Sequence, residues 1–502
     1  MKKFVVLISL LLLASSLFAG QQTWIPLNGD TENAVDIEVL TSTDNLIDLA
    51  YSINGFYKEE ILIDGKAYSK IIIPNEGFFL DKGYPELPHI NRSVLIPPRS
   101  NMEVAVVNSD YEEFENIYVI PSKGSFSREI NPEDVPYTFD HMYNDDAWYP
   151  QEIVVARDPY ILRDARGMVI QVQPFQYNPV QHKLRVYTNI SVTVTENGYS
   201  DVNIKDRGLF ECETVAASFL EVYKTQFINY ERASQYYRHV PTPAVGSMVI
   251  VTYDDFADEM QPLYEWKNKK GIPTQMVNVS TLGNDYTTIK NYIQNLYDTW
   301  NLAFILIVGD APQVVPYENN KDPLYACLEG GDSYPDAYVG RFSAETGAQV
   351  ETQVNRVLYY ESDPFISGDW MQQGTGVASD QGTGYNGWYD YQMMNVIRDS
   401  LLAWNYTDVD QIYDPSATAS DVANAINNGR SVVNYCGHGS TTSWGTTGFS
   451  VSNINALTND NMYPTVICVA CLNGNFVSST CFAEAWARAT VSAENLPTYA
   501  SG

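Results

Sequence analysis

The run SMVIVTY occupies residues 247–253 and marks the first strand of an α/β region. A short, continuous apolar run of this kind is typical of a parallel strand that is buried on both faces of its sheet. Similar runs follow at 303–310 (AFILIVGD), 336–342 (DAYVGRF), 431–435 (SVVNY) and 464–470 (PTVICVA). Their recurrence indicates a parallel sheet.

Helical patterns lie between these runs. Apolar residues recur at the i, i+3, i+4 spacing of one helix face at Ile289, Tyr292, Ile293, Leu296 and Tyr297. Because strands that alternate with helices build parallel sheets, residues 246–502 are expected to form an α/β domain.

The first half of the chain has a different pattern. Residues 21 to about 235 are β-rich, as shown by MVIQVQPFQYNPVQHKLRVYTNISVTVTENG at 168–198, where alternating runs are separated by turn residues. From Lys205 to Pro243 the alternation of apolar and polar residues is lost, and this stretch ends in PTPAV at 241–245. We expect an exposed linker there, ending at about residue 245.

Residues 1–20, MKKFVVLISLLLLASSLFAG, have the form of a secretory signal peptide. Lys2 and Lys3 precede an apolar run, and Ala19 offers a small residue for cleavage. No later stretch is long and apolar enough to cross a bilayer, so no membrane span is expected in the mature chain.

The net charge is −31, from 61 acidic and 30 basic residues. A chain this acidic repels phosphate backbones, which argues against nucleic-acid binding. Structural calcium stays open, although no compact acidic loop stands out. The chain has six cysteines, too few in 502 residues for a disulfide scaffold, and four of them lie between Cys436 and Cys481.

Two of the expected strands end in unusual sequence. Residues 431–435 run into Cys436-Gly437-His438-Gly439-Ser440, and residues 464–470 run into Cys471. Active sites of open parallel sheets form beyond the carboxyl ends of the strands. If these strands are neighbours, an imidazole and a thiol meet at one sheet edge.

Of the five histidines, only His438 lies within the α/β region. Histidine is the natural general base near neutral pH, and flanking glycines let the backbone approach a substrate. The other interpretation, a histidine held in a tight turn, stays open. Cys471 ends its strand, where a thiol can be exposed and activated, whereas Cys468 is expected to face the other side and be structural.

A zinc site made from Cys436, His438, Cys468 and Cys471 is the alternative for this cluster. It fits poorly, because residues three apart on a strand face opposite sides and C-x-H is not a usual ligand spacing.

Several motifs together resemble the gingipain-type cysteine peptidases of peptidase family C25, which are caspase-like enzymes secreted by bacteria. The most specific are VNYCGHGSTTSWGT at 433–446 and VACLNGNF at 469–476. The others are MVIVTYDDF, EWKNKKGIPT, ILIVGD, YVGRFSAET and CFAEAWARA. The resemblance implies a caspase-like parallel sheet, and the earlier GYPELPHINRSVLIPP looks like part of the family's inhibitory propeptide.

The resemblance also implies roles for individual residues. His438 matches the catalytic histidine and Cys471 the nucleophile, while the N–H groups of Gly439 and Cys471 match the oxyanion hole. Asp380, after the strand GTGVAS, matches the acid that orients the histidine, or is simply a solvated loop carboxylate.

The substrate side of the site is expected to include Asp390, Cys436 and Gly437. Asp390 falls where arginine-specific members place the acid of the primary specificity pocket, which suggests Arg or Lys before the cut bond. The alternative for Asp390 is a helix cap.

The implied protein is a secreted or cell-surface bacterial endopeptidase, made as a zymogen, with no cofactor needed for its chemistry. Its partners would be protein or peptide substrates and its own propeptide, residues 21–235, released by a cut such as after Arg232 or Arg238. Relatives continue beyond the point that matches Gly502, so we expect a truncated C-terminus. The rival classes are a catalytically silent adhesin or binding module and a zinc-dependent protein.

Overall fold

The structure is a computed structural model. It describes residues 22–28, 33–127, 130–237, 239–362, 368–382, 388–459, 461–477 and 479–489, so the expected signal peptide and Arg238 lie outside the described residues. The chain divides into two compact units, which are described separately. The first contains Met1–Pro159, Ala165–Phe210 and Tyr223–Val240, and the second contains Tyr160–Asp164, Glu211–Val222 and Pro241–Gly502.

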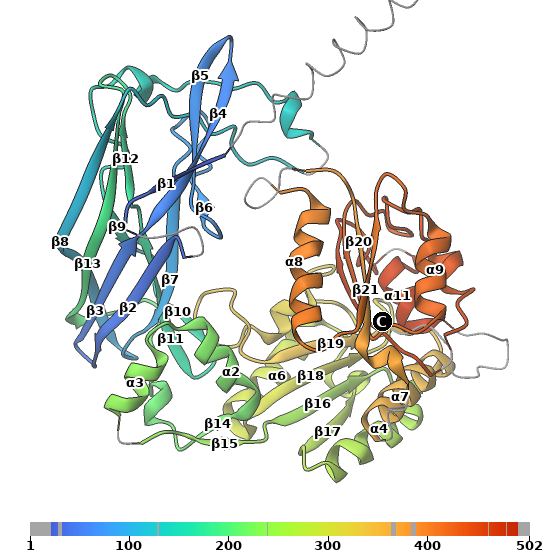
Figure 1. Cartoon of the computed structure of the whole chain (residues 1–502). Coiled ribbons are helices and arrows are strands. Elements are labelled where there is room, and N and C mark those ends of the chain that lie inside the picture. The colour runs from blue at the N-terminus through green and yellow to red at the C-terminus, as the bar shows by residue number, and fades with distance from the viewer. Residues whose placement is uncertain are drawn as a thin grey trace, which may run out of the picture. The chain divides into compact units, whose positions relative to one another are not determined.

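The first unit is built from antiparallel strands (Figure 1). Its strands are β1 (Thr23–Pro26), β2 (Val35–Ser42), β3 (Leu46–Ile53), β4 (Gly55–Ile63), β5 (Lys66–Ile72), β6 (Gly77–Phe78), β7 (Pro88–Leu95), β8 (Ser100–Glu115), β9 (Val154–Ala156), β11 (Ala165–Val172), β12 (Phe175–Asn178) and β13 (Lys183–Tyr199). Strand β13 pairs with β12, β3 and β8, while β11 pairs with β7 and β9. The predicted β-rich first half is therefore confirmed.

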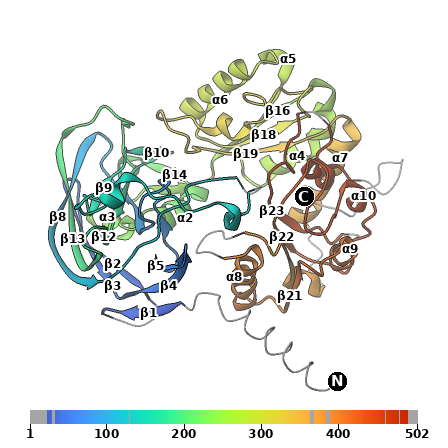
Figure 2. The ribbon, with the colours of Figure 1, turned by 90° about the horizontal axis from the view of Figure 1, so that it is seen from above.

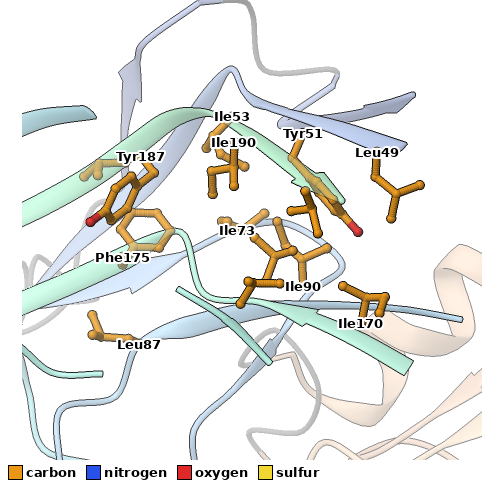
Figure 3. Close-up of a cluster of buried hydrophobic side chains, with 14 of the residues drawn as sticks. Leu49, Tyr51, Ile53, Ile73, Leu87, Ile90, Ile170, Phe175, Tyr187 and Ile190 are labelled. Atoms are coloured by element: carbon orange, nitrogen blue, oxygen red, sulfur yellow. The ribbon is translucent and has the colours of Figure 1, made fainter. Parts of the chain in front are cut away.

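Alternation of buried side chains builds the core of this unit. Every second residue of β3, from Ile47 through Leu49 and Tyr51 to Ile53, is buried, as the period of two in a strand requires. Figure 3 shows Leu49, Tyr51 and Ile53 with Ile90 of β7 in one apolar cluster, to which Ile47 also belongs.

The second unit holds two parallel sheets. The first has the order β17-β16-β18-β19. Its strands are β16 (Ser247–Thr252), β17 (Thr274–Asn278), β18 (Leu302–Val308) and β19 (Tyr338–Phe342), and its helices are α4 (Ala257–Lys269), α5 (Val279–Leu282), α6 (Tyr286–Trp300) and α7 (Gly347–Ser362). Helix α6 packs on one face of the sheet, and α4 and α7 pack on the other (Figure 2).

The second sheet has the order β21-β20-β22-β23 and is also parallel. Its strands are β20 (Gln373–Ala378), β21 (Asp408–Tyr413), β22 (Val432–Cys436) and β23 (Thr465–Val469), and its helices are α8 (Asp390–Ala403), α9 (Ala419–Asn427), α10 (Val451–Ile454) and α11 (Phe482–Arg488). Val433 of β22 packs in one cluster with Ile426 of α9 and Trp486 of α11. The predicted parallel α/β architecture is confirmed, and its strands form two sheets rather than one.

The exposed linker expected over residues 205–243 is wrong for much of its length. This segment contains β14 (Thr214–Ala216), α2 (Ala217–Gln226) and α3 (Tyr230–Tyr236), and β14 pairs in parallel with β15 (Thr242–Ala244). Phe219, Tyr223 and Phe227 are buried. Phe219 and Tyr223 share one face of α2, and Phe227 directly follows the helix, a pattern that the loss of strand alternation obscured.

Candidate active site

Strands β22 and β23 are parallel neighbours, as the candidate site requires. Their register pairs Cys436 with Val469, and the Gly437 N–H donates to the Val469 carbonyl at 3.3 Å. Because both strands point the same way, the residues that follow them, including His438 and Cys471, leave the same edge of the sheet.

The backbone of His438 is held firmly. Its carbonyl accepts hydrogen bonds from the Tyr435 hydroxyl at 2.5 Å and from the Gly445 N–H at 2.7 Å. The Tyr435 ring stacks on buried Trp444, with centroids 4.4 Å apart and planes 3° from parallel. The core of the second sheet therefore fixes the loop that carries the imidazole.

The imidazole of His438 has Gln381 as its partner. Its Nε2 lies 2.7 Å from Gln381 Oε1. An amide oxygen only accepts hydrogen bonds, so this contact places a proton on Nε2 and leaves Nδ1 as the nitrogen that can act as a base. Among the residues that the structure describes, no hydrogen bond joins Asp380 to His438. Gln381 was missed from the sequence because a neutral amide next to an aspartate gives no charge signal; its place directly after Asp380 was the one clue.

The loop after His438 lies directly against the turn that carries Cys471. A Cβ on Gly439 would stand 2.7 Å from Ala470 Cβ and 2.8 Å from Asn473 Oδ1, so only glycine fits without a shift. Asn473, 3% exposed, donates from Nδ2 to the carbonyls of Ser440 at 2.6 Å and Ser443 at 3.0 Å. Asn473 therefore ties the two loops together, a role that its place in the polar run after Cys471 did not reveal.

The two cysteines of β23 and its following turn have different environments. Cys468 and Cys471 are both exposed, and Cys471 begins the turn that follows the strand. The Sγ of Cys468 accepts from Trp444 Nε1 and donates to Asn473 Oδ1, both at 3.2 Å. Partial burial of its sulfur raises the pKa of the Cys468 thiol, so this thiol stays protonated near neutral pH.

Asp390 is the first residue of helix α8 and is 6% exposed. Its carboxylate accepts from Ser379 Oγ at 2.5 Å and from Cys436 Sγ at 3.3 Å. These two partners stand at the carboxyl ends of β20 and β22, so the carboxylate is directed toward the edge of the sheet from which His438 leaves.

Among the described residues, no three His, Cys, Asp or Glu side chains are grouped so that they could hold a metal ion. The thiols of Cys436 and Cys468, which the zinc alternative would use, are engaged by Asp390 and Asn473. In the same part of the chain, no helix has the length and apolar character to cross a membrane.

Comparison with known families agrees with the motifs. Residues 242–493 match the model described as Peptidase family C25, and residues 29–236 match the model described as Propeptide_C25. The chain belongs to peptidase family C25, a family of cysteine endopeptidases, and carries the propeptide of that family ahead of the peptidase. The resemblance inferred from the sequence is therefore confirmed.

Curated relatives come from Porphyromonas gingivalis. Gingipain R2 is 35% identical over 82% of this chain and 56% of its own length. Lys-gingipain HG66 is 24% identical over 97% of this chain and 29% of its own. The solved complex of Porphyromonas gingivalis RgpB pro- and mature domains is 31% identical over 51% of this chain and 62% of that one, with a TM-score of 0.49. The chain thus spans about half the length, or less, of these curated relatives.

Proposed function

We propose that this chain is the precursor of a secreted cysteine endopeptidase with Cys471 as nucleophile and His438 as general base. The observation that carries the proposal is the shared edge of β22 and β23, from which both residues leave. Exposure of the Cys471 thiol and fixation of the His438 loop support it. Exposure lets a peptide reach the sulfur, and a fixed imidazole needs no reordering during the reaction.

The reaction is acyl transfer. His438 takes the proton of the Cys471 thiol, the resulting thiolate attacks the peptide carbonyl carbon, and the N–H groups of Gly439 and Cys471 hold the oxyanion that forms. The protonated His438 then gives its proton to the leaving amine as the C–N bond breaks, which leaves a thioester. His438 next takes a proton from water, the hydroxide attacks the thioester, and the C–S bond breaks to release the acid.

Gln381 takes the orienting position that was expected for Asp380. By accepting from Nε2, its amide keeps the lone pair on Nδ1, the nitrogen that would exchange protons with Cys471 and water. A neutral amide stabilises an imidazolium less than a carboxylate does. Asp380, which is exposed in the same loop, stays a candidate for adding charge there.

For specificity we propose that Asp390 receives Arg or Lys before the cut bond, with Cys436 and Gly437 beside it. Its carboxylate, with the Cys436 thiol next to it, points to the edge where the nucleophile's strand ends. Protein or peptide substrates with a cation at this position would satisfy a buried charge.

Maturation is proposed to release the propeptide by a cut after Arg232 or Arg238, and self-processing follows if Arg is preferred. Arg232 is exposed on α3, which makes it accessible, whereas Arg238 lies outside the described residues. N-terminal sequencing of the mature species should place the new end between about Lys205 and Gly246, and an end elsewhere would reject this maturation scheme.

The test of function compares propeptide-free wild type with Cys471→Ala on fluorogenic peptides that carry Arg, Lys or Asn before the cut. Cys327→Ala is the matched control, because the Cys327 thiol lies outside the site and donates to the Pro323 carbonyl at 3.7 Å. We expect thiol-dependent, chelator-insensitive cleavage that is lost in Cys471→Ala and kept in Cys327→Ala. If folded wild type cuts nothing across a broad library, the chain is instead a binding module with this fold.

A further inference from the structure

Two segments of the propeptide belong to the peptidase's own compact unit. Residues 29–236 match the propeptide model, yet Tyr160–Asp164 and Glu211–Val222 fall within the second unit, together with both parallel sheets. The first segment is the short strand β10 (Tyr160–Leu162) and the turn after it, and the second contains β14.

Arg163 is the centre of the first segment. It is 2% exposed, and its guanidinium is shared among peptidase acceptors. Nη1 donates to the carbonyls of Leu302 at 2.6 Å and Asp336 at 2.8 Å, and Nη2 donates to Asn301 Oδ1 at 2.7 Å. The fork of a guanidinium can serve three acceptors at once in this way, which the point charge of a lysine cannot reproduce.

Aromatic rings from both propeptide and peptidase enclose this guanidinium. Its carbon lies 5.1 Å from the ring centre of Phe219 and 5.3 Å from that of Tyr297. Phe219 belongs to the second propeptide segment and is buried, and its ring centroid lies 4.8 Å from that of Tyr338 of β19. The Tyr338 hydroxyl also donates to the Ser218 carbonyl at 3.0 Å. The two propeptide segments thus share one site.

The backbone around Arg163 is held by two peptidase aspartates. The Arg163 N–H donates to Asp336 Oδ1 at 2.7 Å, and the Ile161 N–H donates to Asp332 Oδ2 at 2.8 Å. Arg163 has a φ of +51°, a left-handed conformation in which glycine or asparagine is favoured. The hydrogen bonds of its N–H and its side chain help to hold this turn in that conformation.

We propose that Tyr160–Asp164 and Glu211–Val222 form a latch, centred on Arg163, that docks into a peptidase site separate from the active centre and keeps the propeptide bound after the connecting chain is cut. This rests on the proposed zymogen. The peptidase side of the latch site, residues 297–338, belongs to the end of α6, the first parallel sheet and the connection to its last strand, whereas His438 and Cys471 follow strands of the second sheet.

The order of the chain supports this role. The proposed cuts at Arg232 and Arg238 come after both latch segments, so a cut propeptide keeps the whole latch. Releasing the propeptide then requires the buried Arg163 fork to leave its acceptors, or a further cut within the latch.

The experiment uses the full chain with Cys471→Ala, so that it cannot process itself, and a sequence-specific protease site placed between Tyr237 and Pro241. After complete cutting, the two fragments are separated by size-exclusion chromatography, and their dissociation constant is measured. We expect co-elution for the parent and a dissociation constant raised on the order of tenfold or more by Arg163→Ala. Arg163→Lys should also weaken binding, because it keeps the charge but loses the fork.

Two further variants separate loss of the latch contacts from misfolding. Asn301→Gly removes only the side-chain acceptor, since Asn301 has a φ of +52° that glycine adopts easily, and it should weaken binding without unfolding the chain. Arg157→Ala is the matched control, because Arg157 donates to Gln171 within the first unit. This variant should bind as tightly as the parent does. Parent-like binding by folded Arg163→Ala or by Asn301→Gly would overturn the latch. The experiment measures binding between two fragments of a protein that lacks the Cys471 thiol. Its result therefore does not depend on whether the peptidase proposal is correct.

Discussion

Replacing Asn473 by alanine tests whether one amide joins the two loops of the site. The change removes donations to the Ser440 and Ser443 carbonyls and the acceptor for Cys468 Sγ. The Ser443 carbonyl keeps the Ser440 N–H at 2.9 Å, so only part of the hydrogen bonding is lost. At about 0.5–1.5 kcal/mol for each of the two lost amide donations, the free energy of unfolding should fall by roughly 1–3 kcal/mol.

Activity should fall further than stability. Without its tie, the loop of His438 and Gly439 is free to move away from the turn of Cys471, and a misplacement near 1 Å can lower the rate about 100-fold. We therefore expect kcat/KM to drop on the order of 10–100-fold, mainly in kcat, because the substrate pocket is untouched.

The assays are urea unfolding and cleavage of the preferred fluorogenic peptide by the mature protein. Asn475→Ala is the matched control. Asn475 follows Cys471 in the same loop, and its buried Oδ1 has no hydrogen-bond partner among the residues that the structure describes. It should stay within about 0.5 kcal/mol of wild type in unfolding. An Asn473→Ala protein that is as stable as wild type and keeps at least half its kcat/KM would refute the reasoning.

Three other predictions concern single side chains. Gly439→Ala places a methyl group 2.7 Å from Ala470 Cβ and should lower kcat by roughly 100-fold, whereas Gly474→Ala, with open space around it, should be silent; equal kinetics of the two would contradict the close approach. Asp390→Asn keeps the shape but removes the charge, so kcat/KM for Arg and Lys peptides should fall by about 100-fold or more while the melting temperature changes little; unchanged cleavage of cationic peptides would exclude Asp390 from specificity. Burial raises the pKa of Asp336 from 3.8 to about 6, so the folded state holds a proton that the unfolded state has released. The stabilisation that this proton gives the folded state is fully present below pH 3.8 and is lost as the pH rises through about 6. It amounts to about 3 kcal/mol of unfolding free energy at most. Urea unfolding of wild type and Asp336→Asn at several pH values should show the stability advantage of wild type shrinking over that range, and a constant difference would disagree.

Local pattern was enough to predict the architecture. Buried parallel strands are recognised from continuous apolar runs such as SMVIVTY. Half-buried strands are recognised in the first half of the chain because buried and partly buried residues alternate strictly, as they do in β3. His438 and Cys471 were also proposed from local signals, because each follows an apolar strand and enters glycine-rich or polar sequence. The sequence misjudged the segment around Phe219, where helical burial hides behind the loss of strand alternation.

Contacts between distant residues are decided by tertiary structure alone. Nothing in the sequence near Gln381 shows that its amide reaches His438, 57 positions later, or that Asn473 bonds back to Ser440. In the sequence, Arg163 looks like an ordinary charged turn residue. Only the folded structure shows that Asn301 accepts a hydrogen bond from its guanidinium. The physical reason is that periodicity reports which face of an element is buried, while the partner of a polar side chain depends on where separate elements end in space. By itself, then, the sequence determined the family, most of the secondary structure and the choice of His438 and Cys471 as the residues proposed to react, and the tertiary structure decided which amides and buried charges lie around them.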